Sequence, residues 1–431
     1  MKAWVMALSV VYQPRRLVAL GTLSTLATLC ALSSLAAAAP DEDRLGKADG
    51  YPIGTPANYF FDESVRVGSF SNVDKINFRA VTLAPLKAST QPMPLPKAAA
   101  PPNFRWSIDG RSYSLDDYLD RQRIMGLMIV KDGEVLVERY QYERTPAHRF
   151  ISNSMAKSIA SLAFGFALQE GLLASLDERA DALAPELKGT LYGETTVRQL
   201  LRMSSGARFS EIYNGQDDLS RFTAEATLRG IPSAARLITE REAPAGSRFK
   251  YASAETAVLS QVFQSVAKQN LADFLGTRLW QAIGAANDAL WIKNKFGVIS
   301  AGGGFNATLA DYARLGIVLA HDGMRPDTQQ QIIPKDYLLE ATDWKRQSAA
   351  FHPRTATPYH GYGYQFWTFP GDKRRFALLG VYGQMILIDP ALKLVMVQTA
   401  ANATARAGGT SLAREADALW RGLVAHYGKW D

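Results

Sequence analysis

The sequence predicts an α+β fold: an antiparallel sheet flanked by helices, with a mostly helical subdomain. Strand-like segments come early and again near the end of the chain, and the segments between them are mainly helical in character. Hairpins at both ends indicate one antiparallel sheet with strands from both parts of the chain. The 431 residues, 47% hydrophobic and 21% charged, suffice for one large domain or two average ones.

The early strands form a predicted hairpin. Residues 126–130 and 135–140 are apolar and rich in β-branched side chains, and Asp132 and Gly133 between them favour a two-residue turn. A short helix is expected just before it, because Ser114 is a good cap and two acids follow it at the positive end of the helix.

The rest of the domain is predicted from changes of period. After Ser154 the apolar residues follow a helical period, and Gly171 is placed to end that helix. The mostly helical stretch 176–345 is broken by loops at 185–195, 203–218, 243–250 and 293–306. Strands are expected again at 376–379, 385–388 and 394–399, and a last helix at 411–425.

Residues 1–39 are not expected to belong to the fold. A basic start without acids precedes an apolar run over 17–35 and four alanines, the pattern of a secretory signal peptide. Cleavage near Ala38 or Ala39 would place the mature protein in the periplasm or outside the cell. Two alternatives stay open: a retained membrane anchor, for which the run is only marginally long enough, and a twin-arginine signal at Arg15 and Arg16.

Removing this segment changes the charge and the cysteine content. The full chain has a net charge of +7 and one cysteine, Cys30. Three of its 48 basic residues and none of its 41 acidic residues lie in the segment, so the mature chain has a net charge of about +4. With no basic run of five, nucleic-acid binding loses its support. A single cysteine excludes a disulfide framework, an iron–sulfur cluster and a cysteine-based zinc site.

Residues 40–103 are interpreted as an N-terminal arm and linker. Six prolines fall between positions 85 and 102, with small residues between them, which favours an extended segment over a packed domain. The globular domain is expected to span 104–431.

Ser154 and Lys157 are the first candidates for chemistry. At a helix start, residues three apart share one face. A serine hydroxyl needs a neighbouring base to become a nucleophile, and a lysine supplies one if burial lowers its pKa. Amides at the helix N-terminus stabilise an oxyanion. The alternative is that Ser154 only caps the helix and Lys157 is solvated.

A second S-x-x-K stands at Ser247 and Lys250, but it follows a Pro-Ala-Gly loop with exposed residue types. Ser154 is favoured because it opens a long apolar helix.

Tyr251 is a further candidate: it could exchange a proton beside Lys157, or be a core tyrosine. The glycines of 380–384 would let a substrate approach the backbone, or mark a bulge or an edge strand. The glycine turn at 302–304 could equally be a tight connection.

Taken in order, these motifs resemble the serine β-lactamase and penicillin-binding protein superfamily, in its class C and esterase branch, over about residues 104–427. The order is a hairpin, S-x-x-K, the stretch 196–206, a tyrosine motif, a glycine turn and closing strands. Within that branch the nearest likeness is to the 6-aminohexanoate-dimer (nylon-oligomer) hydrolases, on residues 203–213 and 380–384.

The resemblance implies a two-step acyl transfer. Ser154 would be the acylated nucleophile, Lys157 would take its proton, and Tyr251 would share that proton and deliver it to the leaving group. The backbone amides of Ser154 and Val381 would form the oxyanion hole. No metal or cofactor is implied.

The resemblance also suggests substrate-binding positions. Tyr213 would lie in a loop over the substrate, Asn306 would belong to the pocket wall, and Tyr382 and Gly383 would lie on the strand beside the substrate. The expected partner is a small-molecule amide or ester; no nucleic acid and no stable membrane anchor are expected.

Two departures from the superfamily pattern restrict the class of substrate that is expected. Leu378 stands where relatives often carry Lys or His for a substrate carboxylate, which favours amides or esters lacking that group. Ser253 ends the tyrosine motif where β-lactamases commonly have Asn. The sequence therefore predicts an exported serine hydrolase of small amides or esters. The alternatives are a β-lactamase or penicillin-binding D-alanyl-D-alanine peptidase, and a non-catalytic binding protein of the cell envelope.

Overall fold

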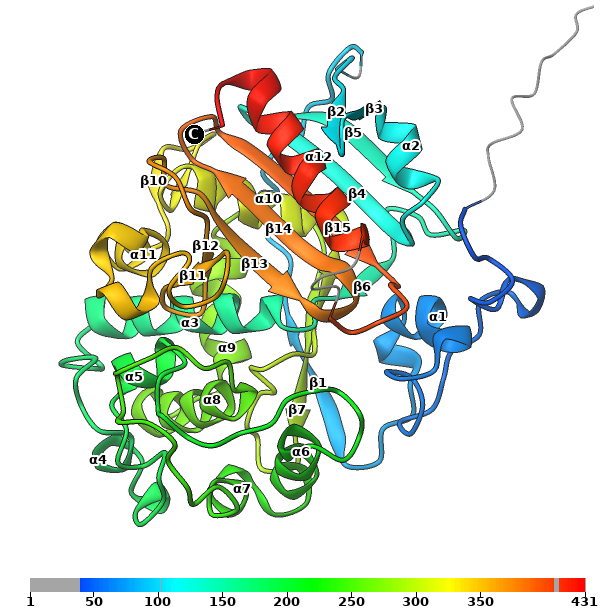
Figure 1. Ribbon diagram of the computed structural model, residues 1–431. Coiled ribbons are helices and arrows are strands. Elements are labelled where there is room, and N and C mark those ends of the chain that lie inside the picture. The colour runs from blue at the N-terminus through cyan, green and yellow to red at the C-terminus, as the bar shows by residue number, and fades with distance from the viewer. Residues whose placement is uncertain (1–38, 101, 407–410, 431) are drawn as a thin grey trace, which may run out of the picture. The chain divides into compact units, whose positions relative to one another are not determined.

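A seven-stranded antiparallel sheet, with strand order β11-β12-β13-β14-β15-β4-β5, organises the computed structural model (Figure 1). The late strand β15 pairs with the early strand β4, so segments far apart in sequence share one sheet, as predicted. The strands are β4 (Ile124–Lys131), β5 (Glu134–Tyr140), β11 (Gly361–Tyr362), β12 (Trp367–Thr368), β13 (Phe376–Gly380), β14 (Gln384–Asp389) and β15 (Leu394–Ala400).

The structure describes residues 39–100, 102–406 and 411–430, and these residues belong to one compact unit. The predicted signal peptide lies outside the described residues, except for Ala39. Within the described ranges, no helix combines the length and the apolar character needed to cross a bilayer.

The β4–β5 hairpin has the predicted turn. Asp132 and Gly133 both have positive φ, 51° and 84°, as a type I′ turn requires. This turn matches the right-handed twist of the flanking strands, which is why Asp-Gly is favoured there.

Helices cover both faces of the sheet, because side chains alternate between the faces along each strand. Leu127 and Ile129 of β4 pack on one side with α12 (Ser411–Tyr427), which crosses the sheet in Figure 1. Met128 and Val130 belong to the main core on the other side. The remaining elements of the first face are β2 (Trp106–Ile108), β3 (Arg111–Tyr113) and α2 (Leu115–Leu119); α3 (Met155–Gln169) and α10 (Leu309–Ala320) pack on the second.

The middle of the chain is largely helical, as predicted. It contains α4 (Ala180–Leu183), α5 (Val197–Leu201), α6 (Asp218–Arg229), α7 (Ile231–Ala235), α8 (Ser253–Ala267), α9 (Leu271–Leu275), a π-helix η5 (Gly276–Gln281) and α11 (Lys335–Thr342). Short 3₁₀ helices are η1 (Lys47–Asp49), η2 (Glu63–Val65), η3 (Val73–Lys75), η4 (Pro185–Leu187), η6 (Trp344–Arg346), η7 (Ala349–Phe351) and η8 (Val381–Gly383).

A second sheet, with order β1-β7-β8-β6, was not predicted. Its strands are β1 (Val81–Leu86), β6 (Arg149–Ile151), β7 (Ala289–Asn294) and β8 (Phe305–Thr308), and a separate pair joins β9 (Met324–Arg325) to β10 (Gln330–Gln331). The loop expected over 293–306 therefore carries the ends of two strands. β6 and β8 have only three and four residues, too few to show a strand period.

The segment 40–103 is packed more closely than the sequence suggested. Residues 87–100, 102 and 103, the described part of the stretch after β1, contain no helix or named strand. However, α1 (Arg66–Phe70) is buried, and β1 pairs with β7. Apolar side chains of this segment join the main core: Leu45, Tyr51, Val67, Phe70, Val73, Leu86 and Met93. Glycine and proline turns separate these residues, so they show no period in the sequence.

Candidate active site

Ser154 stands at the N-terminus of α3, directly after the short strand β6. Asn153 has a positive φ of 45°, so the chain turns sharply between the strand and the helix. The Ser154 side chain makes no capping hydrogen bond to its own helix. The hydroxyl is therefore available for another partner, which argues against a purely capping role.

That partner is Lys157. Its Nζ donates to Ser154 Oγ at 3.0 Å and to the carbonyl of Gly302 at 2.6 Å. Lys157 is 1% exposed, so the alternative in which this lysine is solvated is wrong. Burial lowers the pKa of Lys157 to about 8, and the charge of Glu211 opposes this change. The glycine turn at Gly302 is thus part of the site and more than a connection.

Tyr251 completes the group. Lys157 Nζ lies 5.2 Å from the centre of its ring. Burial raises the pKa of Tyr251 above its usual value, and the neighbouring Ser154 hydroxyl acts in the opposite direction. The ring stacks on Trp367 with centroids 5.6 Å apart, so its position is fixed by packing.

The second S-x-x-K is built differently. Ser247 Oγ donates to the Pro244 carbonyl at 2.6 Å within its own loop. Lys250 forms an ion pair with Glu242 at 2.5 Å, and its side chain is 31% exposed. No hydrogen bond joins this serine and lysine within the described residues. The structure thus separates the two motifs as the sequence context suggested.

Glu211 is a buried group that the sequence reasoning missed. Its carboxylate accepts hydrogen bonds from the Ser253 amide and hydroxyl, both at 2.7 Å, and from the Tyr213 hydroxyl at 2.6 Å. It therefore holds Tyr213, the residue expected over the substrate, against the start of α8. The Ser253 amide offers a favourable place for this charge at the helix N-terminus. Nothing in the surrounding loop sequence signals this, because the partner at Ser253 is distant in the chain.

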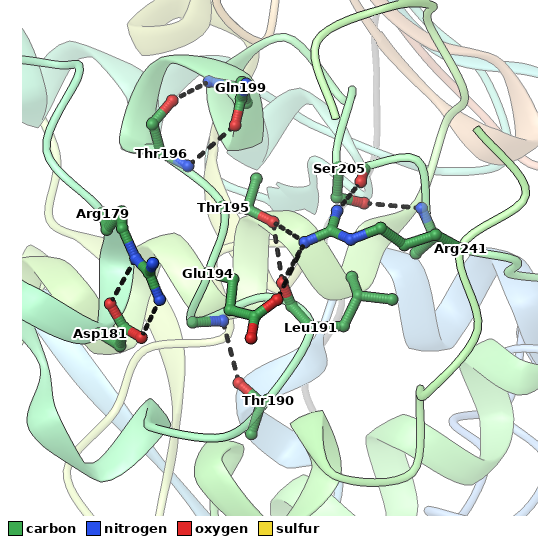
Figure 2. Close-up of polar contacts among 12 residues, drawn as sticks. Arg179, Asp181, Thr190, Leu191, Glu194, Thr195, Thr196, Gln199, Ser205 and Arg241 are labelled. Carbon is green, nitrogen blue, oxygen red and sulfur yellow. Dashed lines mark hydrogen bonds and ion pairs between the residues drawn. The ribbon is translucent and has the colours of Figure 1, made fainter. Parts of the chain in front are cut away.

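The loop that carries Glu211 and Tyr213 is anchored at its beginning, at Ser205. The Ser205 hydroxyl donates to the buried carboxylate of Glu255 at 2.7 Å. Arg241 donates to the Ser205 carbonyl and, at 2.8 Å, to the Leu191 carbonyl (Figure 2). Burial raises the pKa of Glu255 to about 8, against the effect of the Ser205 hydrogen bonds. These contacts fasten the loop to the helical region.

The end of β13 lies against the segment that carries Ser154. A Cβ added at Gly380 would be 2.4 Å from the Ser152 carbonyl oxygen and 3.1 Å from the Ser154 amide nitrogen. The Val381 carbonyl accepts a hydrogen bond from Asn153 Nδ2 at 3.0 Å. The backbone of Gly380 and Val381 is therefore beside the Ser154 amide, which is where the expected oxyanion hole would need it.

The next two residues face elsewhere. The Tyr382 side chain is 4% exposed and packs on Phe60 and Phe70 of the N-terminal arm. Gly383 has a φ of 91°, and a Cβ there would lie 2.6 Å from Asn402 Nδ2. The contacts of both residues are thus with the arm and with the segment after β15. Their expected substrate contacts stay predictions.

Asn306 is not brought into the group. It lies in β8 opposite Ile151, is 1% exposed, and donates to the Gly304 carbonyl at 2.8 Å. Its amide group therefore supports the glycine turn, and the structure gives no contact that would make it a pocket wall. Leu378 is fully buried in the core, and its side chain is uncharged, so it offers no cation to a substrate.

Gly380→Ala is expected to lower kcat/KM by about 100-fold if Ser154 is the nucleophile, because the added methyl must displace the Ser152 carbonyl and the Ser154 amide, and an ångström of misplacement is costly. Steady-state kinetics and thermal unfolding would measure this. Gly276→Ala is the matched control, since a Cβ there meets nothing within 4 Å. Wild-type kinetics in Gly380→Ala would contradict the close approach described.

These features define the class of protein. The chain belongs to the Beta-lactamase family, whose model matches residues 115–418. This confirms the superfamily and the α+β fold that the motifs predicted.

Particular relatives narrow the relationship. The chain is 25% identical to the 6-aminohexanoate-dimer hydrolase of Paenarthrobacter ureafaciens over 293 residues, which are 66% of this chain and 74% of the relative. A proposed 6-aminohexanoate-dimer hydrolase from Bacillus anthracis has the same fold, with a TM-score of 0.74, 22% identity, and coverage of 86% of this chain and 96% of that one. An octameric penicillin-binding protein homologue from Pyrococcus abyssi gives a TM-score of 0.52, 19% identity, and coverage of 71% and 75%.

Proposed function

We propose that this protein is an exported serine hydrolase that cleaves small amides or esters through an acyl-enzyme on Ser154. The observation that carries the proposal is the buried Lys157, 3.0 Å from Ser154 Oγ, with a pKa of about 8. Near neutral pH an appreciable fraction of such a lysine is unprotonated and able to act as a base. Residues 1–39 support export, since their pattern is that of a signal peptide.

The proposed reaction has two steps. Ser154 Oγ attacks the substrate carbonyl carbon while Lys157 accepts the hydroxyl proton, and the carbonyl oxygen becomes an oxyanion held by the amides of Ser154 and Val381. Tyr251 protonates the leaving amine or alcohol as the bond to carbon breaks, and Lys157 passes the serine proton to Tyr251, so both side chains return to their starting states. Water then attacks the acyl carbon and gives a proton to the same pair of side chains. The bond from carbon to Ser154 Oγ breaks, Oγ takes this proton from the pair, and the acid is released.

The substrate class follows from the third motif and the relatives. The buried Leu378 offers no cation to a carboxylate at the position where relatives often have one. The sequence relationship to a 6-aminohexanoate-dimer hydrolase supports linear amides. The match to the Beta-lactamase family supports the second candidate, a β-lactamase or D-alanyl-D-alanine peptidase.

The test is a substrate panel with mass spectrometry of the acylated protein. The purified enzyme is given the linear dimer of 6-aminohexanoate, p-nitrophenyl esters, a fluorescent penicillin and, separately, a fluorophosphonate. We expect one fluorophosphonate adduct on the Ser154 peptide, and faster turnover of the amide or ester than of penicillin. Penicillin labelling without turnover of the others would favour the second candidate. No adduct and no turnover would overturn both.

A further inference from the structure

We propose that Arg66, in the N-terminal arm, is a positioning residue that holds the 3₁₀ turn η8 (Val381–Gly383) in place for catalysis. The inference rests on the proposed function, in which the Val381 amide is half of the oxyanion hole. Arg66 lies outside residues 115–418, which match the family, so the family relationship alone does not point to it.

Arg66 is buried without a carboxylate partner. It is 1% exposed, and within the described residues no acid lies at ion-pair distance from it. Its guanidinium donates to the Asn402 carbonyl at 2.8 Å and to the Phe61 carbonyl at 2.9 Å, and it lies 4.2 Å from the centre of the Tyr382 ring. Burying an unpaired charge in this way costs free energy. We therefore look for the role of Arg66 in the segments that it connects. It joins the arm, the segment after β15 and η8.

The residue beneath Arg66 has a backbone that needs support. Tyr382 has φ 61° and ψ 20°, the left-handed region that is unfavourable for a residue with a side chain. Such conformations persist where the surroundings enforce them. Three side chains of the arm pack against the Tyr382 ring. Arg66 lies over its face, and the ring centroids of Phe60 and Phe70 lie 5.1 Å and 5.5 Å from that of Tyr382.

The other side of the same turn touches the nucleophile. The Val381 carbonyl is held by Asn153 Nδ2 at 3.0 Å, and Gly380 abuts the Ser154 amide. The turn is thus fixed between the arm and the start of α3. If the contacts of the arm with the Tyr382 ring are lost, the Val381 amide moves relative to Ser154. An oxyanion contact acts mainly in the transition state, so the loss should appear in kcat more than in KM.

Arg66→Met tests this, because methionine keeps an apolar stem and removes the guanidinium. Arg144→Met is the matched control: Arg144 also fastens the arm, through the Ser71 hydroxyl at 2.8 Å and the Tyr51 ring at 5.5 Å, but among the described residues no hydrogen bond or ring contact joins it to η8. With a p-nitrophenyl ester as substrate, we expect Arg66→Met to lower kcat about 10- to 100-fold, with KM within about twofold of the wild-type value. Arg144→Met should lower the melting temperature similarly and leave kcat unchanged.

Arg66→Lys and Phe60→Leu provide milder versions if Arg66→Met does not fold, and both should lower kcat with KM little changed. The rate at which a fluorophosphonate acylates Ser154 is measured in every variant. Wild-type kcat in the folded Arg66 and Phe60 variants, or an equal loss in Arg144→Met, would overturn this inference while the wild-type adduct leaves the proposed function standing. Absence of an adduct in the wild-type enzyme would instead overturn the proposed function and this inference with it.

Discussion

Ser154→Ala is expected to lower kcat/KM for amide and ester substrates by at least about 10⁴-fold, because removing a nucleophile leaves only binding and oxyanion stabilisation. Ser154 Oγ accepts a hydrogen bond from Lys157 Nζ and makes no capping bond to its own helix, so its loss removes little that holds the helix. The melting temperature should therefore stay close to that of the wild type. Initial rates and mass spectrometry after fluorophosphonate treatment would measure the loss.

The chain offers its own control for this experiment. Ser247 begins the second S-x-x-K, is exposed, and bonds only within its loop. Ser247→Ala should keep wild-type rates and the full fluorophosphonate adduct. If Ser154→Ala retained its activity, or if Ser247→Ala lost it, the assignment of the nucleophile would be wrong.

The parts of the fold that were predicted correctly are those whose signal is local. The Asp132-Gly133 turn fixes the β4–β5 hairpin by backbone preference alone, and the apolar period after Ser154 fixes α3. By contrast, the segment containing Val67 and Phe70 was interpreted as an arm, because its burial depends on strands and helices far along the chain. No local pattern records a contact of that kind.

The candidate site divides in the same way. Ser154 and Lys157 are three residues apart on one helix, so their proximity follows from helix geometry. Tyr251 could be expected beside them only through the resemblance, since nothing local links it to α3. Glu211 left no signal, because its partner Ser253 lies 42 positions away. Burial, the property that most changes the chemistry of Lys157, is likewise a product of the complete fold.

Lys157→Met is expected to lower kcat/KM by about 10³-fold, as is typical for the loss of a general base, without destabilising the protein. A fall in the pKa of Lys157 from 10.5 to about 8 corresponds to roughly 3 kcal/mol of unfavourable free energy for the buried ammonium at neutral pH. Methionine fills similar space without this cost. The two lost hydrogen bonds offset the gain by about 1 kcal/mol each. The free energy of unfolding at pH 7, from denaturant titration, should equal or exceed that of the wild type.

Lys250→Met is the matched control, since Lys250 belongs to the other S-x-x-K and pairs with Glu242 near the surface. An exposed pair of this kind contributes about 0–1 kcal/mol, so both stability and activity should change little. A Lys157→Met enzyme that kept its rate would exclude this lysine as the base.

The dependence on pH separates the proposed catalytic role of Lys157 from the effect of Lys157 on stability. Only the unprotonated lysine accepts the Ser154 proton, so wild-type kcat/KM should rise with pH and level off above about pH 8. Below that pH, Lys157 is protonated in both folded and unfolded protein, and the burial cost is fully present. Between about pH 8 and 10.5 the unfolded chain binds more protons than the folded one, so wild-type stability gains relative to Lys157→Met. The stability advantage of Lys157→Met should therefore shrink over the range in which wild-type activity has reached its plateau; an advantage that is constant with pH would mean that Lys157 does not titrate as its burial requires.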